Sequence, residues 1–232
     1  NRFPYLSSSI EGKHIKSVLD EKQGEAVVLG FDSKAARIEL AKLVKMASSM
    51  RFQNREVHEW FAGTLRFTPA QVESGDGLDV NTIPLPPGGK KLLAYTSSWK
   101  HMELLNRLGI HKLFAAIEAQ QIVAGPLILA ILSPGHNAER LNAGRLMERV
   151  WCYLNAQGIA VHPYFVVSDQ LDRYKKGELP HELNAMGKSL EKRVGELWGE
   201  GNNLQMLLRV GYPKLQPVHS RRLDVSQVLV SP

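Results

Sequence analysis

The side chains that could act as acids, bases or metal ligands are scattered through this sequence. Its eight histidines include no pair at metal-ligand spacing beside a glutamate or cysteine, so the sequence predicts no metal site. No short motif of a serine or cysteine nucleophile is present. His162, directly before Pro163, has a side chain suited to proton transfer near neutral pH, with a packed or surface histidine as the competing interpretation. The sequence pattern therefore assigns no catalytic residue.

Two features of the charge bear on possible ligands. The segment 88–91 (GGKK) lacks the first glycine and the following Ser or Thr of a phosphate loop, which favours a solvated loop. The chain has 29 Lys and Arg against 23 Asp and Glu, a net charge of +6. Acids are mixed with the basic residues, and no long basic run occurs, so we expect no nucleic-acid partner. This modest excess also fits an anionic ligand, such as a phosphorylated cofactor.

Cysteine content and hydropathy indicate the cellular compartment that the chain suits. Cys152 is the only cysteine, which excludes an internal disulfide and predicts a reducing, cytoplasmic location. We expect it to be a buried small residue rather than a nucleophile. No apolar run is long enough to span a bilayer, so no membrane partner is expected. The start, residues 1–4 (NRFP), has no methionine and no signal-peptide segment, and we expect the chain to be a piece of a longer polypeptide.

The elements that would position these side chains centre on one stretch, residues 130–167. An apolar run at 126–132, bounded by glycine and proline, predicts a buried strand. Asn137 can cap a helix whose apolar residues recur at three- and four-residue spacing, and Gly158 suits its end. Residues 159–167 are apolar again and predict a second strand.

The flanking segments give further helices, strands and two irregular regions. Ser33 and Asn54 are suited to begin helices. The turn-rich segment 67–91 predicts a long loop or lid. Strands separated by helices indicate an α+β or α/β domain. Further helices are predicted at 10–19, 97–107, 111–121, 169–176 and 181–198, strands at 24–31 and 204–212, and an extended tail at 213–232.

Several segments resemble the nitroreductase family. Residues 207–213 (LLRVGYP), with the later Arg221-Arg222 pair and Val228-Leu229, resemble its C-terminal signature. Residues 143–163 are similar to its long central helix, which ends in a glycine and is followed by a strand and a proline. Residues 1–4 are similar to the end of its N-terminal basic motif. Residues 76–78 and 85–86 resemble a variant branch that joins two nitroreductase-like halves in one polypeptide.

This resemblance implies a fold and an assembly. The fold is α+β, with a mostly antiparallel sheet of four or five strands wrapped by helices, a long central helix and an extended C-terminal tail. Residues 1–232 would form one nitroreductase-like domain. The partner would be a second copy, in a homodimer, or a second nitroreductase-like half, in a fused pseudo-dimer, with FMN at the interface.

The resemblance also implies cofactor-binding residues. Arg2, Arg221 and Arg222 match the family positions that bind the FMN phosphate. Arginine suits this role, since a guanidinium group can bind phosphate through two parallel hydrogen bonds. For the two tail arginines, pairing with a neighbouring acid is an equally good interpretation. For Arg2 the competing interpretation, which is favoured, is a mobile residue near the chain terminus. The backbone of Tyr164, Phe165 and Val166 matches the groups that face flavin N5 and O4. NAD(P)H would donate electrons, and a small molecule with a nitro or quinone group would accept them.

Two departures from the family pattern leave a second function open. The Ser-x-x-Asn-x-Gln-Pro-Trp segment that contacts the flavin has no match, and Phe165-Val166 replaces the usual Glu-Gly pair. The first hypothesis is therefore an FMN-dependent oxidoreductase. The alternative is a degenerate, non-catalytic domain that binds or sequesters flavin or serves as a dimerisation module.

Overall fold

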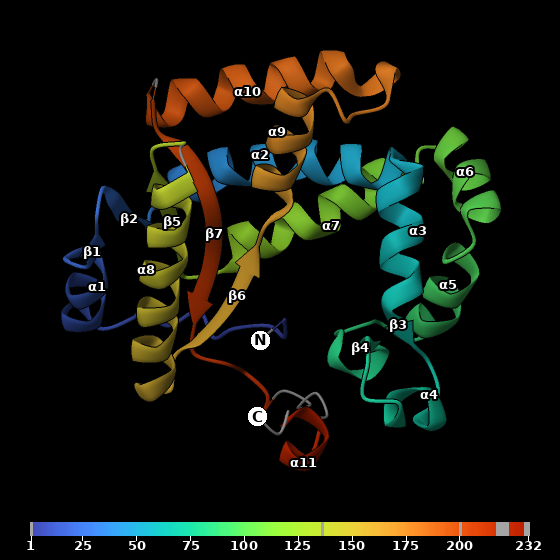
Figure 1. The fold of residues 1–232 in the computed structure, drawn as a ribbon, viewed down its shortest axis with the longest axis horizontal. Coiled ribbons are helices and arrows are strands. Elements are labelled where there is room, and N and C mark those ends of the chain that lie inside the picture. Colours follow the sequence, from blue (N-terminus) through green and yellow to red (C-terminus); the bar gives the residue numbers. More distant parts are fainter. Residues whose placement is uncertain (1, 136, 200, 217–222, 230–232) are drawn as a thin grey trace.

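The fold is built around one five-stranded sheet. The computed structural model describes residues 2–135, 137–199, 201–216 and 223–229. The central strand of the sheet is β5 (Leu127–Ser133), all seven residues of which are buried, as the apolar run predicts. The strand order is β1-β2-β5-β7-β6, and every neighbouring pair is antiparallel (Figure 1). The other strands are β1 (Lys22–Gln23), β2 (Ala26–Phe31), β6 (Ala160–Tyr164) and β7 (Asn203–Gly211).

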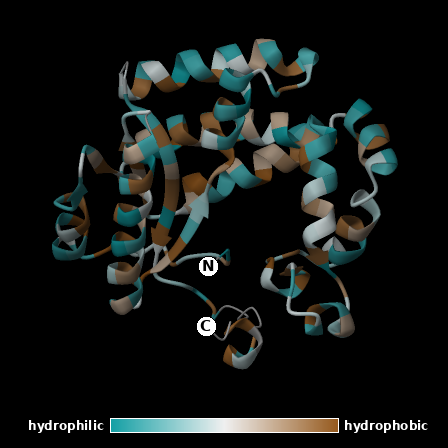
Figure 2. Cartoon of the chain, in the orientation of Figure 1, coloured by the Kyte–Doolittle hydropathy of each residue, from teal (hydrophilic) through white to brown (hydrophobic). Residues whose placement is uncertain are grey.

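Helices cover both faces of the sheet, so alternate strand residues enter two separate apolar cores. Ile128 and Leu207 point into the first core, whereas Leu129 and Leu208 point into the second. Figure 2 shows mostly hydrophobic residues in the central strands and a mixture of hydrophilic and hydrophobic residues in the helices around them. The first core is closed by α2 (Lys34–Gln53), α7 (Ile110–Ala124), α9 (Val166–Lys176) and α10 (Asn184–Trp198), and the second by α1 (Gly12–Leu19) and α8 (Asn137–Ala156). None of the described helices is both long and apolar enough to cross a membrane.

Local capping signals place several helix ends where the sequence predicts them. The Ser33 side chain accepts from the Ala36 amide at 3.2 Å and begins α2. The Asn54 side chain accepts from the Val57 amide at 3.3 Å and begins α3 (Arg55–Thr64). Gly158, with φ of +71°, follows α8 in the left-handed conformation that glycine adopts easily.

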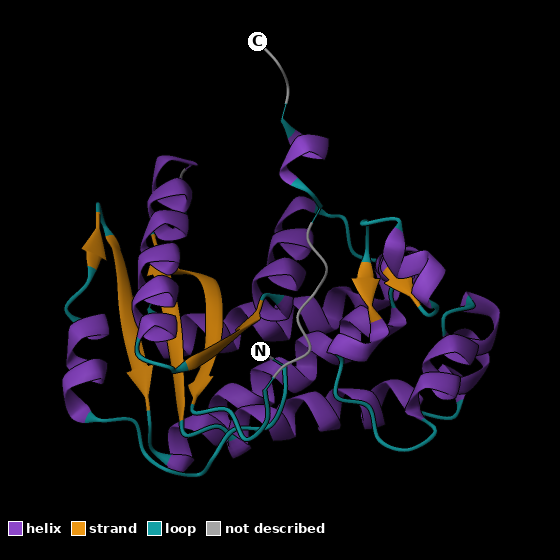
Figure 3. Cartoon of the chain, turned by 90° about the horizontal axis from the view of Figure 1, so that it is seen from below, coloured by secondary structure: helices purple, strands orange, loops and turns teal. Residues whose placement is uncertain are grey.

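The segment between α2 and α7 forms a separate lobe of short elements (Figure 3). Thr68 caps the short helix α4 (Pro69–Glu73) in a capping box. The Arg66 guanidinium forms an ion pair with Asp76 at 2.8 Å. The predicted loop at 67–91 therefore contains regular structure, held by local polar contacts. After α3 the lobe contains β3 (Leu65–Arg66), α4 (Pro69–Glu73), β4 (Leu78–Asp79), the 3-10 helix η1 (Val80–Thr82), α5 (Gly89–Thr96) and α6 (Trp99–Arg107).

Several sequence predictions are wrong in detail. The strand predicted to reach residue 167 ends at Tyr164, because Val166 and Val167 begin α9 and are buried in the first core. The helix predicted from residue 10 begins at Gly12. Cys152 is exposed on α8 rather than buried. The tail is not extended throughout, since α11 (Val225–Val228) forms a helical turn after Asp224, and the 3-10 helix η2 (His181–Leu183) precedes α10.

Candidate functional site

The last residue of β6, Tyr164, lies at the centre of a buried polar cluster. Its side chain is 7% exposed, and its hydroxyl donates to Gln121 Oε1 of α7 at 2.8 Å. Its ring centroid is 4.5 Å from that of His162, two residues earlier on the same face of the strand. Burial raises the pKa of the Tyr164 hydroxyl well above its usual value, and the positive charge of Arg209 opposes this rise. The phenol therefore stays protonated and acts as a donor.

Arg209 brings a buried positive charge to this cluster. It lies in the middle of the apolar strand β7, directly opposite His162, and is 3% exposed. Its Nη2 donates to the carbonyl oxygens of Arg2, at 3.1 Å, and Phe3, at 2.9 Å. Its guanidinium carbon lies 4.2 Å from the centre of the Tyr5 ring. Within the described part of the chain Arg209 forms no ion pair, so carbonyl dipoles and an aromatic face stabilise its charge.

His162 is neutral in this environment. Desolvation lowers the pKa of its imidazole to about 2, and the charges of Arg209 and Arg2 act in the same direction. Its Nδ1 is buried without a hydrogen-bond partner among the described residues, as is Nε of Arg209. An imidazolium form that could donate a proton is therefore not populated near neutral pH. This finding argues against His162 as a general acid.

A second polar group borders the cluster on the helical side. Arg51 of α2 pairs with Glu118 of α7, and the Ser48 hydroxyl donates to the same carboxylate. Both charges act on the Tyr164 hydroxyl, Glu118 raising its pKa and Arg51 lowering it. Counting Arg2, Arg51 and Arg209 against Glu118, positive charge predominates around Tyr164.

The N-terminus of α9 follows Tyr164 directly. Phe165 occupies the N-cap position with φ of −86° and ψ of −14°, and no side chain caps the helix. The first amides of a helix lack intrahelical acceptors and carry the positive end of its dipole. The Phe165 side chain is 54% exposed beside them. This end of α9 can therefore donate hydrogen bonds to an acceptor-rich or anionic group.

The structure brings four of the six predicted cofactor-binding residues together. Tyr164, Phe165 and Val166 are consecutive at the β6–α9 junction. Arg2 lies at the surface nearby, where desolvation lowers the pKa of its guanidinium and the neighbouring Tyr164 raises it. Arg221 and Arg222 lie outside the described residues.

Three residues that hold the parts of this site together were not predicted from the sequence: Tyr5, Gln121 and Arg209. Arg209 carried a usable signal, because a charged residue inside the apolar run 204–212 is unusual unless it has buried partners. Tyr5 and Gln121 carried no such signal. Their importance depends on contacts between residues 204 positions apart, for Tyr5 and Arg209, and 43 apart, for Gln121 and Tyr164.

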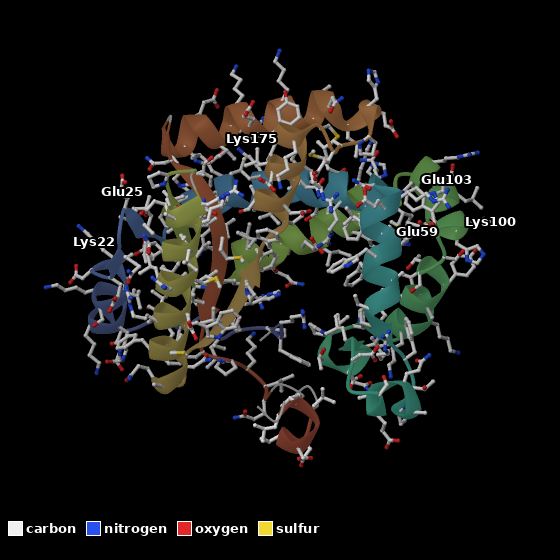
Figure 4. The ribbon with its side chains drawn as sticks, in the orientation of Figure 1. Lys22, Glu25, Glu59, Lys100, Glu103 and Lys175 are labelled. Carbon is white, nitrogen blue, oxygen red and sulfur yellow. The ribbon has the colours of Figure 1, made fainter. Side chains whose placement is uncertain are left out.

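Other charged and concave regions lie away from this cluster. Figure 4 shows labelled charged side chains on outer elements: Lys22 on β1, Glu59 on α3, Lys100 and Glu103 on α6, and Lys175 on α9. A cleft of about 570 Å³ lies where the end of α2 meets the start of α7, lined by Gln53 and His111 among others. Among the described residues, no group of three or more His, Cys, Asp or Glu side chains is placed to hold a metal ion.

Comparison with known proteins gives no match at the level of sequence and several at the level of structure. No protein-family model matches the chain, and no curated protein sequence is similar to it. The structure is similar to the FMN-dependent nitroreductase NfnB from Mycobacterium smegmatis, solved in complex with NADPH, with a TM-score of 0.54 and 15% identity. That match covers 99% of this chain and 92% of the other.

Two further solved structures have a similar fold. A nitroreductase-like family protein from Bacillus cereus has a TM-score of 0.50 and 9% identity, covering 100% of this chain and 90% of its own. A nitroreductase with bound FMN from Bacteroides fragilis has a TM-score of 0.50 and 8% identity, covering 99% and 92%. These identities are low, but the matches extend over nearly the whole chain, and the sheet and helices agree with the α+β architecture that the sequence resemblance implies. The chain therefore has a nitroreductase-like fold.

Proposed function

We propose that this protein is an FMN-dependent oxidoreductase that reduces nitro or quinone-type acceptors with NAD(P)H. The observation that carries the proposal is the placement of Arg2, whose carbonyl accepts from the buried Arg209 at 3.1 Å, at the polar cluster that ends at Tyr164 and the start of α9. On a nitroreductase-like fold these groups match the phosphate-binding and ring-binding positions that the sequence resemblance predicts. The solved proteins of similar structure include FMN-dependent nitroreductases, one of them with NADPH.

The chemistry of the residues predicted to bind FMN suits an anionic flavin. Arg2 would bind the phosphate together with Arg221 and Arg222, since a phosphate group carries nearly two negative charges at neutral pH. The backbone of Tyr164, Phe165 and Val166 would donate to acceptor atoms of the flavin ring, and the excess of arginine around Tyr164 would stabilise negative charge on it. FMN, when bound, supplies the hydride chemistry, while the chain supplies binding, orientation and electrostatics.

The proposal includes an assembly. The partner is a second copy in a homodimer, or a second nitroreductase-like half in a fused pseudo-dimer. The contact would lie on the exposed side of α8, where Gly144 would allow a partner to approach the helix backbone closely and an added Cβ meets nothing within 4 Å in the single chain. Residues 1–232 would act as one cytoplasmic domain, with 67–91 as a lid over the small-molecule acceptor.

One observation favours a non-catalytic alternative. The Phe165 side chain, 54% exposed beside the free amides of α9, stands where the family has a smaller Glu-Gly pair. A large aromatic group there reduces the room for a flavin ring or for an acceptor stacked on it. The alternative function is flavin binding or sequestration, or dimerisation, without turnover.

Visible absorption tests these proposals first. The purified protein is mixed with FMN, freed of excess by gel filtration and scanned for the oxidised-flavin band. NAD(P)H oxidation is then followed with a nitroaromatic or quinone acceptor. Retained flavin with acceptor-dependent turnover supports the oxidoreductase, and retained flavin without turnover supports the alternative.

An Arg2→Gln variant serves as the site control. Arg2 lies at the surface, so this change should leave the fold intact while weakening FMN retention. A protein that retains no flavin and oxidises no NAD(P)H with any acceptor would contradict the oxidoreductase proposal.

A further inference from the structure

We propose that Arg209 is a positioning residue that holds the N-terminal strap, defined here as residues 2–6, so that Arg2 stays at the polar cluster that contains Tyr164. Arg209 itself is buried and would not touch the cofactor. It would act through Arg2, on the phosphate of the ligand. This inference rests on the proposed function, since it assigns phosphate binding to Arg2.

Backbone hydrogen bonds attach the second half of the strap to the end of β7. The Leu6 amide donates to the Tyr212 carbonyl at 2.8 Å, and the Lys214 amide donates to the Pro4 carbonyl at 3.0 Å. Tyr5 forms an antiparallel bridge with Pro213. These contacts fix residues 4–6 against residues 212–214, which follow β7. None of them involves Arg2.

Arg209 extends the attachment to the first half of the strap. A single guanidinium nitrogen, Nη2, carries two hydrogens and meets two carbonyls, those of Arg2 and Phe3. The same guanidinium stacks on Tyr5, and the Tyr5 hydroxyl donates to the Arg209 carbonyl at 3.4 Å. Arg209 thus contacts three residues of the strap and fixes the backbone from which the Arg2 side chain extends.

Two glycines make the space that this arrangement needs. A Cβ at Gly125 would lie 3.0 Å from Cγ of Arg209, and a Cβ at Gly211 would lie 2.8 Å from the Tyr5 ring. Both positions are buried. Any larger residue at either site would displace Arg209 or Tyr5, so the packing around the strap depends on these glycines.

Lysine could not reproduce these contacts. The guanidinium is planar, presents several donors in fixed directions and stacks on an aromatic ring, whereas an ammonium group is a strongly hydrated point charge. Without the guanidinium, the carbonyl oxygens of residues 2 and 3 lose their donor, and binding must then supply the order that the strap no longer has. The loss should fall on ligands that carry a phosphate.

Comparing FMN with riboflavin isolates this role, because riboflavin has the same ring but no phosphate. Affinities are measured by fluorescence titration for the wild type, Arg209→Met, Arg209→Lys, Arg2→Gln and the double variant of Arg209→Met with Arg2→Gln. We expect Arg209→Met to weaken FMN about tenfold, the size of a lost charge-assisted hydrogen bond, and to leave riboflavin unchanged. The double variant should bind FMN no more weakly than Arg2→Gln alone.

A second measurement reports on the strap without any ligand. Trypsin cleaves after arginine, so the rate of cleavage between Arg2 and Phe3, followed by mass, should rise in Arg209→Met. If Arg209→Met does not fold, Arg209→Lys takes its place, with circular dichroism and thermal melting as controls.

The outcomes separate the two proposals. Equal losses of FMN and riboflavin, or additive effects in the double variant, would overturn the positioning role and leave the proposed function intact. An unchanged cleavage rate after Arg2 would also overturn it. A wild type that binds neither flavin overturns the proposed function, and the phosphate-positioning role falls with it.

Discussion

Arg209 and His162 face each other across β7 and β6, and each has a buried nitrogen without a partner among the described residues. This pairing explains the direction of the His162 pKa, because both desolvation and the neighbouring positive charge disfavour the imidazolium. A neutral imidazole beside a buried arginine avoids a second buried charge. The consequence is a dependence of stability on pH that one substitution can isolate.

The His162 imidazole should destabilise the fold in acid. Its pKa is about 2 in the folded chain, against an ordinary value of 6.5, so the unfolded state binds more protons between these values. Its contribution to stability is complete above pH 6.5 and is lost as pH falls toward 2. Between pH 7 and pH 5 we expect a loss of at most about 2 kcal/mol from this residue. Urea unfolding at both pH values measures it.

The His162→Phe variant supplies the comparison for this acid effect. Phenylalanine retains an aromatic ring, and the unpartnered Nδ1 means that no hydrogen bond from that atom is lost. His58 and His111 also have lowered pKa values and contribute equally to both proteins. If wild type and variant lose the same stability between pH 7 and pH 5, folding does not lower the pKa of His162, and the prediction is wrong.

Individual site residues were predictable only where the family resemblance placed them. Tyr164, Phe165, Val166 and Arg2 were predicted because they match short family motifs, and their role in cofactor binding stays a prediction. The buried contacts of Arg209 could not be found from the sequence, since its partners depend on how the strap pairs with the end of β7.

Helix and strand boundaries followed the sequence where a local signal decided them. Ser33 and Asn54 begin helices because their side chains accept from amides of the first turn, a contact within four residues. The end of β6 was different. Val166 and Val167 favour strands intrinsically, yet they begin α9, because their side chains are buried against the first core. Tertiary packing decided that boundary, and no local pattern reports it.

The junction of β7 with the strap should be sensitive to a single methyl group. A Cβ at Gly211 would also lie 2.8 Å from Cγ of Pro126, so Gly211→Ala overpacks a buried site. We expect a loss of about 1–3 kcal/mol in the free energy of unfolding, measured with urea.

Gly195→Ala is the matched control for Gly211→Ala. Gly195 lies within α10, and an added Cβ there meets nothing within 4 Å. Alanine should therefore stabilise that helix by about 0.5–1 kcal/mol. Equal effects at the two positions would contradict the packing described for Tyr5.

The order of the strands in the sheet was harder to predict from the sequence than the strands themselves. Apolar runs indicated β5 and β7, and the resemblance implied an antiparallel sheet. The central strand β5 pairs with β2 and β7, which lie far from it on either side in the sequence. Such pairing is set by how two layers of helices cover the sheet, and the sequence contains no direct record of it.

The proposed assembly can be tested at the exposed side of α8. We expect light scattering after gel filtration to give twice the chain mass of 25.9 kDa. Gly144→Arg should convert the dimer to monomer without unfolding it, because the added side chain meets nothing in the single chain. Gly63→Arg, on α3, is equally unobstructed and should remain dimeric. A wild type that is monomeric at all concentrations would contradict the homodimer.

The contact between Tyr5 and Arg209 spans 204 positions in the sequence, and this separation has a kinetic consequence. Closing so long a loop is entropically unfavourable, and contacts between distant segments form slowly. During synthesis the strap emerges before β7, so these contacts form only after β7 has left the ribosome. The contacts that Arg209 and the strap add to the cluster around Tyr164 therefore depend on the joining of two distant parts of the chain.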